Sequence, residues 1–61
     1  MRVGDLVMVM KHNLYREDFI GIYVEKKIIG GYDSHKILVG GNFIFIYTNN
    51  GEYEPLLRVI S

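Results

Sequence analysis

Metal-ligating side chains are the first chemistry that this sequence offers. His12, Asp33 and His35 are all types that bind zinc, and Glu52 and Glu54 follow near the end of the chain. Asp33 and His35 are two residues apart, so they share one face if both lie in a strand. Structural zinc sites, however, carry closely spaced cysteines and histidines, whereas this chain has two distant histidines and no cysteine. We therefore expect no metal and no other cofactor.

Nucleophilic catalysis is the second possibility, and the hydroxyl groups argue against it. Ser34, Thr48 and Ser61 are the only aliphatic hydroxyl residues. Ser34 precedes His35 directly, and neighbours in an extended chain point to opposite faces. An activated serine needs a hydrogen bond to its general base, which this placement does not provide. We expect no catalytic residues and no enzymatic activity.

Binding of nucleic acid is the alternative function that the side chains allow. Five tyrosines could stack on bases, and seven basic side chains could meet phosphates. The seven acidic side chains reduce the formal net charge to zero. They also accompany the basic clusters, since Arg16 is followed by Glu17 and Asp18, and Lys26 and Lys27 follow an acidic residue. A nucleic-acid-binding barrel is therefore the second choice.

The composition indicates strands rather than helices. Valine, isoleucine, tyrosine and phenylalanine supply 22 of the 61 residues, while alanine and glutamine are absent. The first group packs well on a pleated sheet and the absent pair favours helices. No apolar run reaches the roughly 18 residues that a membrane-spanning helix requires. We expect an all-β protein with no membrane segment and a cytoplasmic location.

Turn residues divide the chain into short apolar segments. The spacing predicts strands over 6–10, 19–27, 35–39, 43–48 and 57–60, with Gly21 as a bulge or a point of close approach. A turn is predicted at Gly30-Gly31, and the last long hairpin turns at Gly40-Gly41-Asn42, at Asn50-Gly51 or at both. A short 3-10 turn is predicted near Pro55. This pattern predicts a single domain over 1–61, a small barrel of five to six strands. Closure would remove the exposed sheet edges.

Three segments carry a resemblance to a known fold family. They are VGDLVMV at 3–9, FIGIYVE at 19–25 and EYEPLLRVI at 52–60. Together they resemble the SH3-like barrels, and the chain is similar to small SH3-like proteins of phages and marine metagenomes and, more faintly, to SH3-like subunits of photosynthetic complexes. The resemblance implies an SH3-like barrel but names no ligand, because this fold serves many binding functions. The basic stripe of the KOW-type nucleic-acid-binding branch is missing after Glu25-Lys26-Lys27.

Two predicted strands are apolar on both faces, which is unusual for a barrel with a solvated exterior. In the first strand the resemblance to SH3-like barrels implies that Val7 and Val9 face the core, with Leu6, Met8 and Met10 outward. In the fourth we expect the tyrosine-bearing face to be exposed, since a tyrosine hydroxyl favours water. The resulting candidate interaction patch consists of Leu6, Met8, Met10, Phe43, Phe45 and Tyr47.

An exposed apolar patch of this kind is typical of an interaction site. We expect a non-catalytic protein–protein interaction module that docks a protein partner or associates with itself. The alternative is that the polar loop 11–18, with Leu14 and Tyr15, folds over one of these apolar faces.

Overall fold

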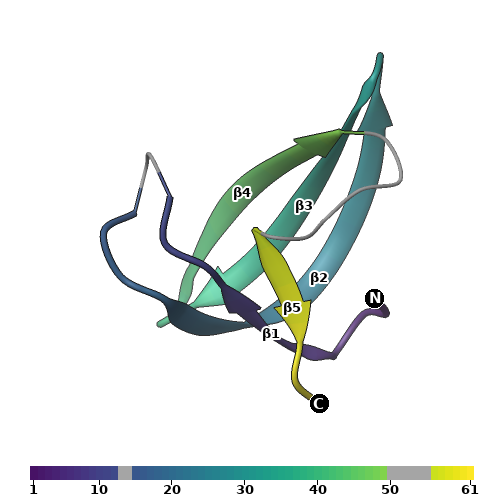
Figure 1. The fold of residues 1–61 in the computed structure, drawn as a ribbon. Coiled ribbons are helices and arrows are strands. Elements are labelled where there is room, and N and C mark those ends of the chain that lie inside the picture. Colours follow the sequence, from purple (N-terminus) through teal and green to yellow (C-terminus); the bar gives the residue numbers. More distant parts are fainter. Residues whose placement is uncertain (13–14, 50–55) are drawn as a thin grey trace.

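Five antiparallel strands follow one another in the computed structural model, which describes residues 1–12, 15–49 and 56–61 (Figure 1). The strands are β1 (Leu6–Val9), β2 (Phe19–Ile29), β3 (Tyr32–Val39), β4 (Asn42–Asn49) and β5 (Leu57–Val59). They form one sheet in the order β4-β3-β2-β1-β5. The all-β prediction is confirmed. None of the described residues belongs to a helix of the length and hydrophobicity that a bilayer crossing requires.

Two tight glycine turns set the register of the long strands. Ile29 pairs with Tyr32 across Gly30-Gly31, and Val39 pairs with Asn42 across Gly40-Gly41. Gly40 and Gly41 both have positive φ, as a two-residue type I′ hairpin requires. The glycine turns are therefore confirmed. Pairing continues up to the first turn, so β3 begins at Tyr32 rather than at His35. The predicted turns at Asn50-Gly51 and Pro55 lie outside the described residues.

A bulge divides β2 and changes which of its residues face inward. The pairing with β3 shifts between Tyr23 and Glu25, so Val24 is the extra residue. Gly21 is a point of close approach instead, because a Cβ at this position would lie 2.5 Å from Ile37 Cγ2. Of the two roles predicted for Gly21, close approach is the one that the structure supports.

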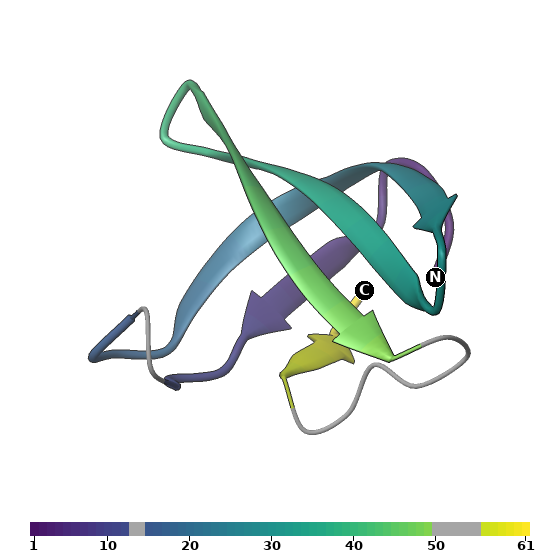
Figure 2. The same ribbon diagram turned by 90° about the horizontal axis from the view of Figure 1, so that it is seen from above.

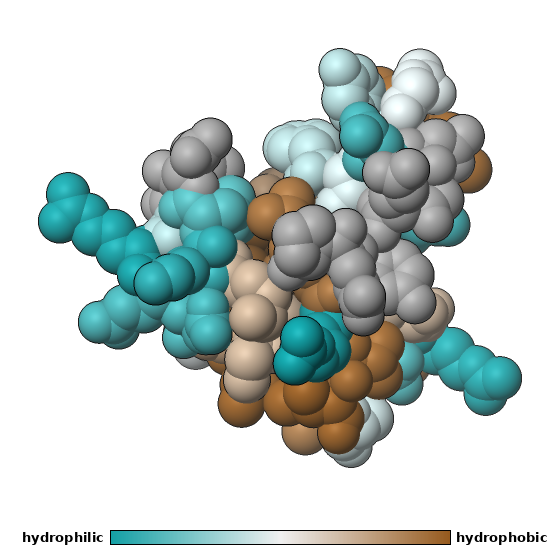
Figure 3. Space-filling model, in the orientation of Figure 1, coloured by the Kyte–Doolittle hydropathy of each residue, from teal (hydrophilic) through white to brown (hydrophobic). Residues whose placement is uncertain are grey.

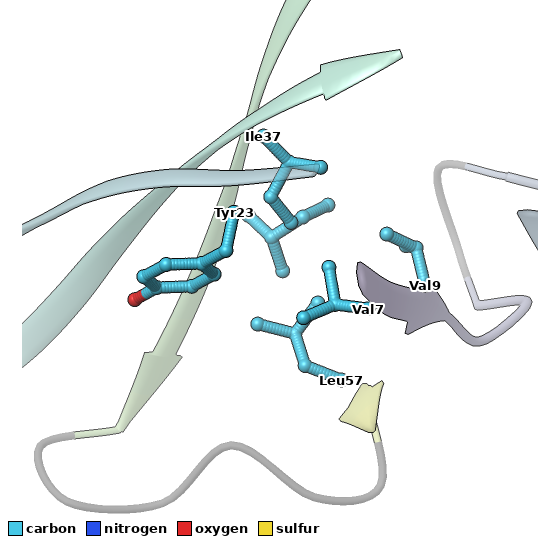
Figure 4. Packing of buried hydrophobic residues seen from close by; sticks show 6 residues of the cluster. Val7, Val9, Tyr23, Ile37 and Leu57 are labelled. Carbon is cyan, nitrogen blue, oxygen red and sulfur yellow. The ribbon is translucent and has the colours of Figure 1, made fainter. Parts of the chain in front are cut away.

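The core lies on the concave face of the sheet. Its buried apolar residues come from all five strands: Val7, Val9, Tyr23, Ile37, Ile46 and Leu57. Figure 4 shows Ile37, Val7 and Leu57 gathered beside Tyr23, with Val9 next to Val7. Ile46 of β4 and Leu57 of β5 belong to this one cluster although they come from opposite edges of the sheet. The twist of the sheet, seen in Figures 1 and 2, brings both edges around a common core.

The sheet nevertheless stays open. β5 has three residues and pairs with β1, and no ladder joins β4 to β5 among the described residues. The predicted closure into a barrel is therefore wrong for the part of the chain that the structure describes. The three residues of β5 pair with β1, which leaves β4 without a second partner among the described strands.

Candidate interaction surface and buried polar chain

The convex face of the sheet, which we call the outer face, carries large apolar side chains. On β1, Val7 and Val9 are fully buried in the core, and Leu6, the first residue of the strand, is 39% exposed. On β4, Ile46 and Thr48 point inward, while Phe43, Phe45 and Tyr47 are 53%, 47% and 57% exposed. Both doubly apolar strands thus have one buried and one outward face, with the orientations that the sequence indicates.

Register places the candidate residues on the same side of the sheet. One row of paired residues runs across four strands. Its members, from β1 through β2 and β3 to β4, are Leu6, Ile22, Leu38 and Phe43. Because directly opposed residues share a face, this row crosses the outer face from β1 to β4. Tyr32 and Ile29 extend the face beside Tyr47 and line with it a shallow apolar cleft of about 260 Å³.

We define the outer patch as the outward apolar side chains of this sheet that are exposed, together with half-buried Met8. Its members are Leu6, Met8, Ile20, Ile22, Ile29, Tyr32, Phe43, Phe45 and Tyr47. Met10, the remaining candidate, is half-buried beyond the end of β1, and its N–H donates to the Leu56 carbonyl oxygen. Sequence reasoning missed the contribution of β2 and β3, because their outward positions also hold Glu25, Lys27 and Lys36.

Hydrophobic surface also reaches solvent at the end of the molecule where β1 and β5 lie (Figure 3). Val59 and Ile60 of the C-terminal segment are each about two-fifths exposed there. Charged and polar side chains flank this region on both sides in the same view.

The described residues of the loop after β1 pack toward the core side. The Tyr15 ring meets the Phe19 ring edge-on at 5.0 Å between centroids, and both residues pack against the core cluster. His12 Nδ1–H donates to the Met10 carbonyl oxygen and its ring contacts Tyr15. Leu14 lies outside the described residues. In the described part of this loop, Tyr15 thus packs at the core rather than across the outer patch.

Basic side chains on the outer face have neighbours of their own. Lys27 Nζ lies 3.5 Å from Glu25 Oε1, and Lys36 Nζ lies 4.3 Å from the centre of the Phe43 ring. The outer face therefore carries both positive and negative side chains next to its apolar residues. Of the tyrosines counted as stacking faces, Tyr23 is buried in the core, while Tyr32 and Tyr47 are exposed.

A second feature is a buried polar chain across β2, β3 and β4, consisting of Tyr23, His35 and Thr48. The Tyr23 hydroxyl lies 2.6 Å from His35 Nδ1, and His35 Nε2 lies 2.7 Å from Thr48 Oγ1. A neutral imidazole donates one of these bonds and accepts the other, and both hydroxyls can take either role. The Tyr23 hydroxyl points away from the aliphatic cluster in Figure 4. The chain therefore joins three strands by satisfied hydrogen bonds.

Burial governs the ionisation of this chain. Burial lowers the pKa of His35; nearby Asp33 opposes this effect, whereas Lys26 and the N-terminus add to it. Burial also raises the pKa of Tyr23, and Asp33 acts in the same direction. Neutral forms are therefore favoured for both groups. With His35 only 2% exposed, these hydrogen bonds lie inside the core, and we call the three side chains that join β2, β3 and β4 the clamp.

The sequence singles out Asp33 and His35 as sharing a face, and the structure places both, buried, on the concave face of β3. It does not bring them together with His12. No group of three or more histidine, cysteine or acidic residues that could hold a metal ion occurs among residues 1–12, 15–49 and 56–61. Glu52 and Glu54 lie outside these ranges.

Comparisons with known proteins add no relative to these observations. The sequence matches no family model, and neither the curated proteins nor the solved structures contain a significant match.

Proposed function

We propose that this chain is a non-catalytic protein–protein interaction module that associates with a second copy of itself through the outer patch. The observation that carries the proposal is the row of exposed aromatic side chains on β4, Phe43, Phe45 and Tyr47, on a face that one continuous apolar row crosses from β1 to β4. Aromatic residues are enriched at the centres of protein interfaces.

The size of the patch supports this function. Each of its four exposed aromatic side chains is about half accessible, which leaves roughly 400 Å² of aromatic surface in water. The largest apolar patch on a typical monomer is about 300–600 Å², and the aliphatic members of the outer patch add to the aromatic area. A standard interface buries about 800 Å² on each partner, so the patch is large enough to supply most of one.

Charge supports a second copy as the occupant. The formal net charge is zero, so two copies do not repel each other. The charged residues on the outer face of the described strands are Glu25, Lys27, Lys36 and Arg58, which include both signs. A face of mixed sign can meet itself without placing only like charges together.

A matched pair of lysine substitutions tests the proposal. Phe45→Lys puts a charge in the middle of the aromatic row and is expected to weaken self-association by about 30-fold, the loss of one interface hot spot. Ile28→Lys is the control, because Ile28 is 63% exposed but pairs with inward-facing Asp33 and so lies on the opposite face. Sedimentation velocity should separate the two variants. Equal association of Phe45→Lys and the unchanged chain would refute the proposal.

We further propose that the fold is SH3-like. The long loop after β1, the two tight hairpins that follow, and a short last strand beside β1 support this assignment. Methyl–methyl NOEs between β4 and β5 across the shared core would test it, since an SH3-like arrangement keeps these edges close in solution.

A further inference from the structure

The free edge of β4 lacks the features that usually protect a sheet edge. Asn42–Asn49 pairs with β3 on one side and with no described strand on the other. Over its eight residues it contains no proline and no charged residue. Sheet edges are usually blocked by short strands, lysines, prolines or bulges. The opposite edge fits this rule, because β5 has three residues and includes Arg58.

We propose that β4 pairs antiparallel with β4 of a second copy, across a two-fold axis at Phe45, so that one sheet continues through both copies. This inference rests on the proposed function and specifies how the second copy binds. The backbone N–H and C=O groups of β4 that point away from β3, which pair with no strand of the described residues, supply the hydrogen bonds. The aromatic row lies on this edge strand, so the same contact covers part of the outer patch.

The sequence of β4 selects the register. With Phe45 opposite Phe45 of the second copy, Phe43 is opposite Tyr47 and Ile44 is opposite Ile46. Aromatic side chains then meet aromatic side chains on the outer face, and isoleucines meet on the inner face. Aromatic and β-branched cross-strand pairs are among the stabilising ones.

Neighbouring registers are poorer matches. Moving the axis to Ile44 places Asn42 opposite Ile46, and moving it to Ile46 places Phe43 opposite Asn49. A shift that pairs odd with even positions would turn the aromatic rows of the two copies to opposite faces. The Phe45-centred register is the one that matches every apolar residue of β4 with an apolar residue.

The inner side of the edge also has apolar surface to contribute. Ile44 packs against the core cluster but is only half-buried, whereas Ile46 is fully buried. In the proposed register the remaining surface of Ile44 lies beside Ile46 of the second copy. Both faces of the edge strand thus gain apolar contacts, and no charged residue of β4 is brought near its copy.

The absence of cysteine from the sequence allows a direct test, because one introduced thiol reports one contact. Directly opposed residues have Cα atoms about 4.5–5.5 Å apart, within the roughly 4.4–6.8 Å that a disulfide spans. Phe45→Cys loses the ring and associates more weakly, but the disulfide traps each dimer that forms, so a linked dimer is expected to accumulate on mild oxidation. Phe43→Cys alone should not give one, since it would lie about 13 Å from its own copy. A mixture of the Phe43→Cys and Tyr47→Cys variants should give a disulfide-linked dimer of one with the other, since these two positions are opposite in the proposed register.

Ile22→Cys is the matched control for the mode of association. Ile22 is exposed on the outer face but lies on β2, two strands from the edge. Two copies stacked face to face can link at Ile22, whereas copies joined along β4 cannot. Non-reducing electrophoresis and mass spectrometry measure the linked fraction, with sedimentation of the unmodified chain run alongside.

The outcomes separate this inference from the proposed function. Linkage of Phe45→Cys, and of the mixed Phe43→Cys and Tyr47→Cys pair, without linkage of Ile22→Cys supports edge pairing. A chain that associates but links at Ile22 as readily as at Phe45 overturns edge pairing and leaves the proposed function standing. A chain that stays monomeric overturns both.

Discussion

Removal of the Tyr23 hydroxyl is the sharpest test of the buried polar chain. Tyr23→Phe keeps the ring in the core and deletes one oxygen, which lies 2.6 Å from His35 Nδ1. The imidazole nitrogen is then left buried without this partner. Leaving a buried polar group unsatisfied costs about 1–3 kcal/mol. A 61-residue domain has a free energy of unfolding of about 3–9 kcal/mol, so the loss is a large share of the total.

Tyr47→Phe is the matched control, because it makes the same chemical change at a side chain that is 57% exposed. Urea unfolding followed by circular dichroism measures both variants at one low protein concentration. With a slope near 1 kcal/mol per molar urea, the midpoint for Tyr23→Phe should fall by about 1–3 M. The Tyr47→Phe midpoint should move by less than about 0.5 M, in line with other surface substitutions. Equal midpoints for the two variants would refute the clamp.

Two further predictions concern the core and acid stability. Gly21→Ala should destabilise the fold by about 1–3 kcal/mol, because the new methyl group would lie 2.5 Å from Ile37 Cγ2. Gly31→Ala is the control in the same urea assay. It should be nearly neutral, because no atom beyond its two chain neighbours lies within 4 Å of a Cβ placed there. Burial lowers the pKa of His35, so as the pH falls the unfolded chain binds a proton before the folded chain does. The free energy of unfolding should therefore be highest above about pH 6.5 and should fall toward pH 5, by at most about 1.4 kcal/mol per pH unit. Urea unfolding curves measured over a pH series check this prediction. The pH dependence of stability should disappear in His35→Gln and remain in His12→Gln. If it remains in His35→Gln, another group is responsible.

Much of the fold follows from local sequence signals. The β-branched and aromatic segments mark all five strands, and each glycine pair stands where a strand reverses. The exposure of Tyr47 follows from its hydroxyl, which favours water. These features depend on near neighbours in the sequence, so residue type and turn chemistry suffice to predict them. The inward orientation of Val7 and Val9 does not follow in this way, because β1 is apolar on both faces; the resemblance to SH3-like barrels implies it.

The features that sequence reasoning missed depend on long-range register. The bulge at Val24 moves Tyr23 onto the face of His35, and no local signal distinguishes Val24 from its neighbours. Thr48 reaches His35 through the pairing of β3 with β4. The alternation of Asp33 and His35 with inward Ile37 is the one signal that could have placed the histidine in the core. Barrel closure failed as a prediction because a count of strands does not reveal which edges pair, and β4 and β5 do not pair among the described residues.

Sedimentation equilibrium of the unmodified chain over a micromolar dilution series tests the proposed self-association most directly. Association through the outer patch predicts an average mass that approaches twice 7.1 kDa at high concentration and falls toward 7.1 kDa on dilution. A mass of 7.1 kDa at every concentration would contradict the account.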